Sequence, residues 1–219
     1  MRPLNFLSVK EHRVMNIASQ EGEVSQADRQ ALLNQTSVTI WFTGISGAGK
    51  SSIAIALEKA LHTQQRVSYR LDGDNLRLGL NKNLGFSETD RRENIRRVGE
   101  VAKLMSDVGL IVLSSFISPY AVDRDTVRKL HEDSGFRFIE VYVDCSVTEA
   151  ERRDPKGLYR KARAGEIENF TGVSHPYEVP AEPDIHLHTE TSTIEDEVIT
   201  IIEYLVAEKI IDSGLVLEN

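Results

Sequence analysis

The segment from residue 38 to residue 51 constrains the fold of this chain more than any other. An apolar, β-rich run, VTIWFTG, leads into Gly44-Ile-Ser-Gly-Ala-Gly-Lys50-Ser51, a complete match to the pattern G-x-x-x-x-G-K-[ST]. Glycines allow such a loop to curl so that its backbone N–H groups converge on phosphate oxygens, and a following helix adds the positive end of its dipole. The sequence therefore predicts a buried strand, a phosphate-binding loop and a helix, in that order.

Four further β-forming runs follow along the chain, near residues 66–73, 110–118, 136–144 and 183–189. Helical patterns alternate with them, over residues 51–62, 87–108, 119–131, 147–153 and 194–207. This alternation predicts parallel strands joined by right-handed crossovers. The expected fold class is α/β, a P-loop NTPase-type doubly wound sandwich with a five-stranded parallel sheet, whose ligands bind beyond the carboxyl ends of the strands.

The charge balance narrows the range of partners. The 219 residues include 26 Lys+Arg and 34 Asp+Glu, a formal net charge of −8. Such a chain is unsuited to coating nucleic acid or anionic lipid through its overall field, and no apolar run approaches the roughly 18 residues of a membrane helix. We therefore expect no nucleic acid and no membrane as partner. Cys145 is the single cysteine, which favours a reducing compartment such as the cytoplasm and a packing role at a strand end.

Residues 1–36 are polar and weakly patterned, and we expect an N-terminal arm there, followed by one globular domain over residues 37–219. The arm is interpreted as a tail with a short helix near residues 26–34. An organelle-targeting segment is the alternative, but Glu11, Glu21 and Glu23 follow the basic start too closely for that class of signal.

The phosphate-binding loop supplies the candidate ATP-binding residues. Lys50 is expected to reach the β- and γ-phosphates, and the Ser51 hydroxyl is expected to bind Mg²⁺. ATP is favoured over GTP because Asn81-Lys82-Asn83-Leu84 departs from the guanine-reading N-K-x-D pattern at its last position. The ATP-binding set in this loop is Gly44, Ser46, Gly47, Ala48, Gly49, Lys50, Ser51 and Ser52.

The second predicted strand ends in Asp72-Gly-Asp74-Asn75, with Arg77 two residues further on. In a phosphoryl-transfer enzyme one such carboxylate can take the proton of the acceptor hydroxyl while the other helps to hold Mg²⁺ through water. The third strand ends in serines and Phe116 rather than in an acid, so Asp72 and Asp74 are the available candidates. Asp-Gly-Asp-Asn is also good turn and N-cap chemistry, and composition alone leaves both interpretations open.

An arginine-rich helix is predicted to begin at Ser87-Glu-Thr-Asp90, which resembles a capping box. Arg91 and Asn94 flank its apolar stripe within the first turns and could face a cleft, where a guanidinium would fork onto a sulfate or phosphate. The remaining arginines of this helix are expected on its solvated face: Arg92, Arg96 and Arg97.

Three long strings of this chain closely resemble the adenylylsulfate kinase family: LDGDNLRLGLNKNLGFSETDRRENIRRVGEVAKLM, SSFISPY and RDPKGLYRKARAGEIENFTG. Members of that family phosphorylate the 3′-hydroxyl of adenosine 5′-phosphosulfate (APS) with ATP. The similarity runs from about Ser37 to the final helix. It implies an ATP- and Mg²⁺-dependent kinase domain over residues 37–219, forming 3′-phosphoadenosine 5′-phosphosulfate and ADP in sulfate assimilation, and a homodimer.

The resemblance also implies roles for individual residues. Asp74 would act at the 3′-hydroxyl, with Asp72 on the metal side. Phe86 and Phe170 would stack on the acceptor adenine, and Ser118 corresponds to a serine described in some members as a phosphoenzyme site. A serine before Pro119 is equally suited to cap a helix, and this choice stays open. The other acceptor-binding residues implied are Asn75, Arg77, Arg91, Asn94, Ile117, Lys156 and Thr171.

The segment from Arg153 to Gly172 is similar to the family's mobile lid, and its cations suit a cover over anionic nucleotides. A solvated basic helix is the alternative. The resemblance further places Arg153 and residues 189–194, Thr189 first among them, beside the donor adenine. Segments 91–97 and 152–163 hold ten of the 26 Lys+Arg residues, which predicts a concentrated basic cleft.

Two other functions fit part of the sequence. One is a phosphate-loop kinase for another small hydroxylated molecule, such as a nucleoside, but such an enzyme would not need Phe86, Phe170 and Arg91 together. The other is a non-catalytic module that binds the product nucleotide, but such a module would not need all of Lys50, Ser51, Asp74 and Ser118.

Overall fold

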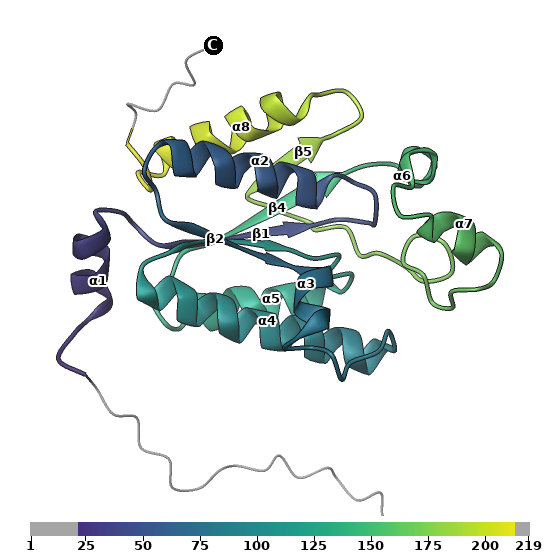
Figure 1. The fold of residues 1–219 in the computed structure, drawn as a ribbon, viewed down its shortest axis with the longest axis horizontal. Helices are drawn as coiled ribbons and strands as arrows, with labels where there is room; N and C mark the ends of the chain where they lie inside the picture. The colour runs from purple at the N-terminus through teal and green to yellow at the C-terminus, as the bar shows by residue number, and fades with distance from the viewer. Residues whose placement is uncertain (1–21, 213–219) are drawn as a thin grey trace, which may run out of the picture.

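Five parallel strands form one sheet in the computed structural model, which describes residues 22–212 (Figure 1). The strand order is β2-β3-β1-β4-β5. Strand β1 lies between β3 and β4, so the strands that follow β1 in the chain lie on both sides of it in the sheet. Ligands of doubly wound sheets bind at the carboxyl end of the strand where this switch occurs. The expected five-stranded parallel α/β fold is confirmed. The strands are β1 (Val38–Thr43), β2 (Ser68–Asp72), β3 (Ile111–Ser115), β4 (Phe138–Asp144) and β5 (Ile185–His188).

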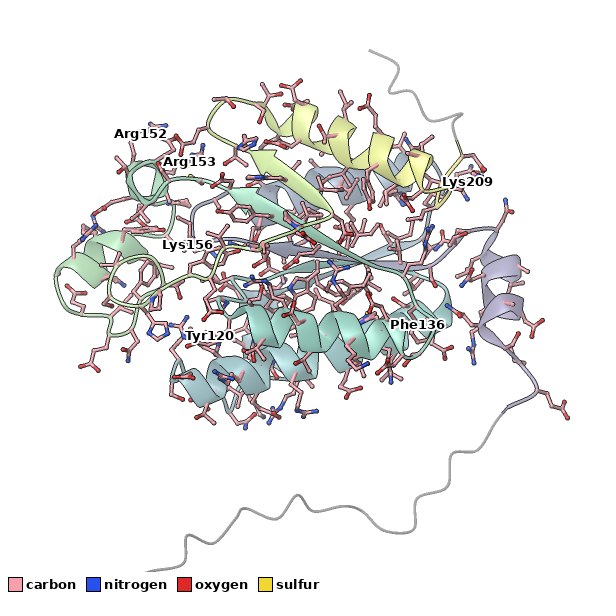
Figure 2. All side chains as sticks on the ribbon, turned by 180° about the vertical axis from the view of Figure 1, so that it is seen from behind. Tyr120, Phe136, Arg152, Arg153, Lys156 and Lys209 are labelled. Carbon is pink, nitrogen blue, oxygen red and sulfur yellow. The ribbon has the colours of Figure 1, made fainter. Side chains whose placement is uncertain are left out.

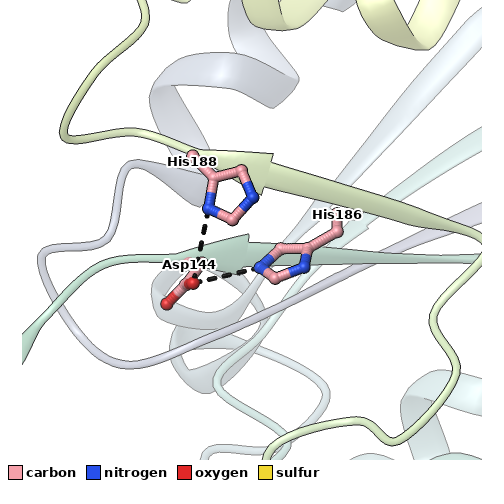
Figure 3. A group of neighbouring side chains, drawn as sticks. All are labelled: Asp144, His186 and His188. Carbon is pink, nitrogen blue, oxygen red and sulfur yellow. Dashed lines mark hydrogen bonds and ion pairs between the residues drawn. The ribbon is translucent and has the colours of Figure 1, made fainter.

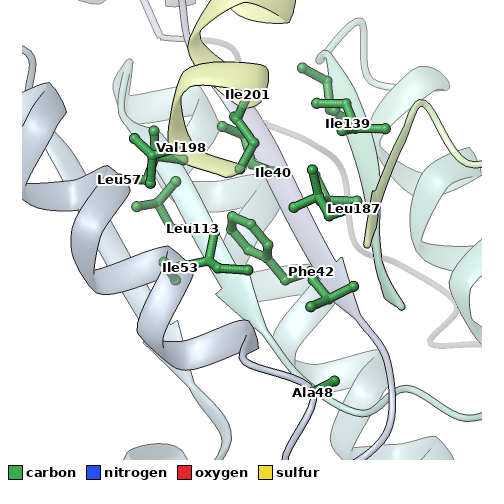
Figure 4. Packing of buried hydrophobic residues seen from close by; sticks show 14 of the residues in the cluster. Ile40, Phe42, Ala48, Ile53, Leu57, Leu113, Ile139, Leu187, Val198 and Ile201 are labelled. Atoms are coloured by element: carbon green, nitrogen blue, oxygen red, sulfur yellow. The ribbon is translucent and has the colours of Figure 1, made fainter. Parts of the chain in front are cut away.

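Four long helices cover the two faces of the sheet (Figure 1). On one face lie α2 (Lys50–Thr63) and α8 (Ile194–Ala207), and on the other lie α4 (Glu88–Val108) and α5 (Ala121–Glu132). Strand β1 is buried on both faces, so its alternate side chains enter two separate cores. Ile40 and Phe42 pack with residues of α2 and α8 (Figure 4), whereas Trp41 packs with residues of α4 and α5.

A short helix, α1 (Gln26–Leu33), lies against the main body at the amino ends of the strands. Arg29 donates to the Asp107 carboxylate at 2.9 Å, and the Gln35 amide donates to the carbonyls of Gly109 and Val67 at 2.7 and 2.9 Å. The predicted helix near residues 26–34 is confirmed. The interpretation of residues 1–21 as a tail lies outside the described residues, and no helix between residues 22 and 212 could span a membrane.

Three further short helices lie at the carboxyl ends of the strands or beyond them, α3 (Gly73–Leu78), α6 (Val147–Arg153) and α7 (Leu158–Arg163). The sequence predicted α6 but neither α3 nor α7. Asp72 accepts from the Asp74 N–H at 3.0 Å and so caps α3. Of the two interpretations of Asp-Gly-Asp-Asn, a turn or a helix N-cap, the structure therefore has the N-cap.

The helix expected from Pro119 instead begins at Ala121, with Tyr120 as its N-cap residue. Ser118 has a positive φ of 39°, and its side chain lies elsewhere, so the helix-cap interpretation of Ser118 is wrong. Cys145 is buried at the end of β4 with no disulfide, as expected.

Candidate active site

A cavity of about 1250 Å³ opens at the carboxyl ends of the strands. That volume exceeds the roughly 300–1,000 Å³ typical of a pocket for one drug-sized ligand. Three of the predicted site residues do not line it: Gly44, Ala48 and Asn75. The predicted residues that do line it are Ser46, Gly47, Gly49, Lys50, Ser51, Ser52, Asp72, Asp74, Arg77, Phe86, Arg91, Asn94, Ile117, Ser118, Arg153, Lys156, Phe170, Thr171 and Thr189.

The phosphate-binding loop owes its shape to glycines with positive φ. A Cβ on Gly44 would lie 2.5 Å from the Val143 carbonyl oxygen, and a Cβ on Gly47 would lie 2.9 Å from that of Ala150. Gly49 starts α2 with a φ of 109° and no side-chain cap, which leaves the first N–H groups of the helix for a ligand. The loop is therefore pressed against β4 and α6 while its donors face the cavity.

Lys50 carries the charge of this loop. Its Nζ donates to the carbonyl oxygens of Gly44 and Ile45 at 2.8 and 2.7 Å. Burial, together with the nearby charge of Lys156, lowers the pKa of the Lys50 ammonium to about 7, while the charge of Asp72 opposes the shift. A phosphate placed at the loop would raise this pKa again, because an anion favours the charged amine.

Ser51 and Asp72 form a pair of oxygen ligands beside the loop. The Ser51 Oγ donates to Asp72 Oδ2 at 2.9 Å. Mg²⁺ prefers oxygen ligands at about 2.0–2.1 Å in octahedral geometry, which places neighbouring ligand atoms roughly 2.9 Å apart. The chemistry and spacing of these two side chains therefore fit Mg²⁺.

Asp74 lies in the first turn of α3 and forms an ion pair with Lys156, from the segment between α6 and α7. Both side chains are more than half exposed, at 69% and 57%. In Figure 2, Lys156 lies on the side of its segment that faces the sheet, whereas Arg152 lies on the outer side. The carboxylate expected at the acceptor hydroxyl and the expected lid lysine thus meet directly.

Arg77 and Arg91 lie beside the ring of Phe86 in the cavity wall. Their guanidinium carbons lie 4.2 and 5.9 Å from the centre of the Phe86 ring. Arg77 donates to the carbonyls of Leu84 and Gly85, and among the described residues neither arginine has an ion pair. Burial lowers the pKa of both guanidiniums, and the charge of Arg91 lowers that of Arg77 further. Two arginines without direct ion pairs beside an exposed aromatic ring suit a nucleotide with an anionic group.

Arg91 also ties α4 to the basic segment, which comprises residues 153–172. It donates to Thr171 Oγ1 at 2.9 Å and to the Asn169 carbonyl at 2.7 Å. Phe170 is 7% exposed and meets the Tyr159 ring edge-on at 5.0 Å, so it offers less free surface than the 61% exposed Phe86. Asn94 is buried in α4, and its Oδ1 accepts from Asn81 Nδ2 at 3.0 Å.

Ser118 is 2% exposed and belongs to a buried hydrogen-bond network. Its hydroxyl accepts from Trp41 Nε1 at 3.1 Å and donates to Thr43 Oγ1 at 2.9 Å. Thr43 Oγ1 in turn lies 2.9 Å from the Tyr177 hydroxyl. The network holds the backbone of Ile117 and Ser118 at the cavity wall.

Arg153 and Thr189, which were predicted together, are in contact. Arg153 donates to Thr189 Oγ1 at 3.1 Å and to the Thr189 carbonyl at 2.6 Å. Thr189 Oγ1 donates to the Ala48 carbonyl at 3.0 Å. This places the loop after β5 against the phosphate-binding loop, and gives Ala48 a supporting position behind the cavity.

The prediction of a concentrated basic cleft is only partly correct, because many of the cations counted for it do not reach the cavity. Five arginines of segments 91–97 and 152–163 form ion pairs with nearby carboxylates and do not line the cavity, namely Arg92, Arg96, Arg97, Arg152 and Arg163. The cavity also receives carboxylates that were not anticipated, from Asp154, Glu166, Glu168 and Glu197. Its electrostatics are mixed, with the positive charge concentrated at a few positions.

Tyr159 is a site residue that sequence reasoning missed. Its hydroxyl donates to the Ser46 carbonyl at 2.8 Å, so α7 is fastened to the phosphate-binding loop. The side chain belongs to a helix that the sequence did not predict, and nothing in the pattern KGLYRKAR marks one aromatic residue as a contact. Trp41 and Tyr177 were missed for a similar reason, since each reads as ordinary core.

Comparisons of the sequence and of the fold with known proteins all point to the same family. A family model described as adenylylsulphate kinase matches residues 36–188. An adenylyl-sulfate kinase of Staphylococcus haemolyticus is 57% identical over 196 residues, covering 90% of this chain and 98% of the relative. One of Saccharomyces cerevisiae is 56% identical over 188 residues, covering 86% and 93%. The structure of a Mycobacterium tuberculosis APS kinase in complex with AMPPNP and APS is 49% identical, with a TM-score of 0.76, covering 78% and 98%.

Proposed function

The chain belongs to the adenylylsulfate kinase family, and from this membership we propose that it transfers the γ-phosphoryl group of ATP to the 3′-hydroxyl of APS. The products are 3′-phosphoadenosine 5′-phosphosulfate and ADP, in the activation of sulfate. The observation that carries the proposal is the placement of α3. Asp72 at its start meets Ser51 of the phosphate-binding loop, Asp74 follows, and Arg77 one turn later meets Phe86. One short helix thereby joins the donor and acceptor ends of the cavity.

At the donor end, the backbone N–H groups of the loop and the first turn of α2 bind the phosphates, and Lys50 reaches the β- and γ-phosphates. Ser51 and Asp72 hold Mg²⁺, which neutralises charge on the phosphates when bound. Arg153 and Thr189 lie beside the donor base. Gly44 and Ala48 act indirectly, because their close contacts set the position of the loop.

At the acceptor end, Arg77 and Arg91 bind the phosphosulfate, and Phe86 stacks on the adenine with Phe170 at its edge. Asn94, Ile117, Ser118 and Thr171 complete this side of the wall. Asn75 receives no role, because its exposed side chain lies outside the cavity.

Asp74 takes the proton of the 3′-hydroxyl in the transfer step. The hydroxyl oxygen forms a bond to the γ-phosphorus while the bond from that phosphorus to the β–γ bridging oxygen breaks, and ADP leaves. Lys50 and the helix dipole of α2 stabilise the charge on the transferred group, so positioning and electrostatics supply most of the rate. Ser118 is not required as a covalent carrier in this direct displacement.

The basic segment acts as a lid over both nucleotides. Three contacts support this role, Tyr159 to Ser46, Lys156 to Asp74, and Arg91 to Thr171. Each joins the segment to a different part of the cavity wall, so opening and closing would change the donor and acceptor sides together. Closure excludes water, which otherwise competes with the 3′-hydroxyl for the phosphoryl group.

We further propose a single kinase domain over residues 37–219, a homodimer and a cytoplasmic location. These follow from family membership, and the free, buried Cys145 agrees with a reducing compartment.

The proposal is tested by following ADP release from Mg·ATP in the presence of APS or adenosine. Release that depends on APS supports it. Equal release with adenosine points to a nucleoside kinase, and no release with any acceptor points to a binding module.

A further inference from the structure

A group of three metal-ligating side chains lies at the exposed edge of the sheet, outside the cavity described above. Asp144 is the last residue of β4, and His186 and His188 belong to the edge strand β5 (Figure 3). Asp144 Oδ2 lies 3.0 Å from His186 Nε2 and 3.6 Å from His188 Nδ1. One oxygen and two nitrogen atoms thus converge on one point.

The strand register explains why these side chains meet. Asp144 pairs with His188 across the two parallel strands, and Tyr142 pairs with His186. Side chains two residues apart share one face of a strand, so all four lie on the same face. On the opposite face, Ile185 and Leu187 pack in the core. The backbone therefore fixes the Cα positions of this group independently of any ligand.

The spacing matches the coordination geometry of zinc. Bonds of about 2.0–2.1 Å to nitrogen and oxygen place neighbouring ligands of a tetrahedral ion roughly 3.3 Å apart. The separations of 3.0 and 3.6 Å from Asp144 Oδ2 to the two histidine nitrogens lie on either side of this value, and all three ligand atoms lie within 4.8 Å of one another. Two imidazoles and one carboxylate suit Zn²⁺ and similar transition-metal ions, whereas Mg²⁺ prefers oxygen ligands.

A second layer of contacts orients the carboxylate. The Tyr142 hydroxyl donates to Asp144 Oδ1 at 3.0 Å, which leaves Oδ2 directed at the two histidines. Outer contacts of this kind tune metal ligands in proteins.

We propose that Asp144, His186 and His188 form a binding site for a divalent transition-metal ion, Zn²⁺ in the first instance, with water completing the coordination. The site joins the edge strand β5 to β4 and is separate from the Mg²⁺ that accompanies ATP. None of its three ligands lines the active-site cavity, so its role is to stabilise the sheet edge.

The proposal is tested by titrating ZnCl₂ into the full chain, previously dialysed against a chelator, in a calorimeter. We expect one site per chain in the wild type and in the control variant His62→Ala, whose exposed histidine lies on α2 away from the group. The double variant His186→Ala/His188→Ala should lose at least a hundredfold in affinity. Tyr142→Phe should lose about tenfold, as expected for an outer contact.

Thermal unfolding provides a second readout. A hundredfold excess of Zn²⁺ over its dissociation constant should raise the midpoint of the wild type by about 5 °C or more and leave the double variant unchanged. Retained kinase activity shows that the double variant is folded. Absence of binding in the wild type, or equal binding in the double variant, overturns the proposal.

Discussion

Lys156 forms an ion pair with Asp74 across 82 positions of sequence, and this contact joins the basic segment to the start of α3. Exposed pairs contribute little to stability, so its importance lies in what it positions. The carboxylate proposed to accept the proton of the 3′-hydroxyl is therefore paired with a lysine of the segment proposed to act as a lid. If both proposals hold, closure and proton transfer involve the same carboxylate.

Replacing Asp74 by asparagine should lower kcat by about 10²–10⁴-fold, the range typical for loss of a general base. Because the Asp74 side chain is 69% exposed, the thermal midpoint should stay close to that of the wild type. The matched control is Asp133→Asn, an exposed carboxylate paired with Lys129 at 2.9 Å on α5. Steady-state kinetics of both variants check this, and near-normal turnover of Asp74→Asn refutes the assignment.

Arg91 and Arg92 are adjacent in sequence and offer a matched pair. Arg91 lines the cavity, whereas Arg92 pairs with Glu88 on its own helix at 2.9 Å. A hydrogen bond to a charged group contributes about 1.5–3 kcal/mol, so Arg91→Ala should raise the KM for APS by roughly 10- to 100-fold. Arg92→Ala should leave it unchanged. If Arg91→Ala weakens ATP and APS equally, the side chain does not belong to the acceptor side.

Lys50 should make stability depend on pH in a definite direction. Its pKa falls from 10.5 to about 7 on folding, so between those values the unfolded chain binds a proton that the folded chain does not. The free energy of unfolding therefore rises with pH through this window for the wild type, relative to Lys50→Met.

Urea denaturation of both proteins at pH 7 and pH 9 measures this. We expect Lys50→Met to be the more stable of the two at pH 7, with a difference that shrinks at pH 9, and to lack kinase activity. A difference independent of pH would show that the buried amine keeps an ordinary pKa.

Ser118→Ala should separate structure from chemistry. Removing the hydroxyl leaves the buried Trp41 Nε1 without its acceptor, which should lower the free energy of unfolding by about 1–3 kcal/mol. If the phosphoryl group is transferred directly, kcat should fall by less than about tenfold, which is much less than the roughly 10²–10⁴-fold loss expected for a general acid or base. The same substitution in a Trp41→Phe background should cost less stability. Loss of all turnover together with loss of a labelled phosphoserine would establish Ser118 as a covalent intermediate.

The parts of the fold that the sequence predicted are those with strong local signals. Strand β1 is a continuous apolar run because it is buried on both faces, and the glycine pattern after it permits few other structures. The long helices α4 and α8 begin at recognisable caps, Ser87 and Thr193. Helix α3 was missed because Asp-Gly-Asp-Asn suits a turn as well as a helix start, and the residue letters alone do not show that Asp72 caps a helix by accepting from the Asp74 N–H.

The distribution of charge was the least predictable property of the site. A count of arginines along a segment ignores the carboxylates one turn away, which neutralise Arg92, Arg96 and Arg152 on their own helices. Asn75 was placed in the site because its neighbours belong there, yet it does not line the cavity, whereas the equally exposed Asp74 does. Helix orientation, which decides such cases, depends on packing that adjacent residues do not encode.

The most direct test of the central claim is to identify the product. The protein is incubated with Mg·ATP and APS, and the nucleotides are analysed by phosphorus NMR and mass spectrometry, with Asp74→Asn in parallel. We predict one molecule of 3′-phosphorylated APS for each ADP formed, and strongly reduced formation with the variant. ADP formation without a new phosphate on APS, or a phosphate at any other position, would contradict the account.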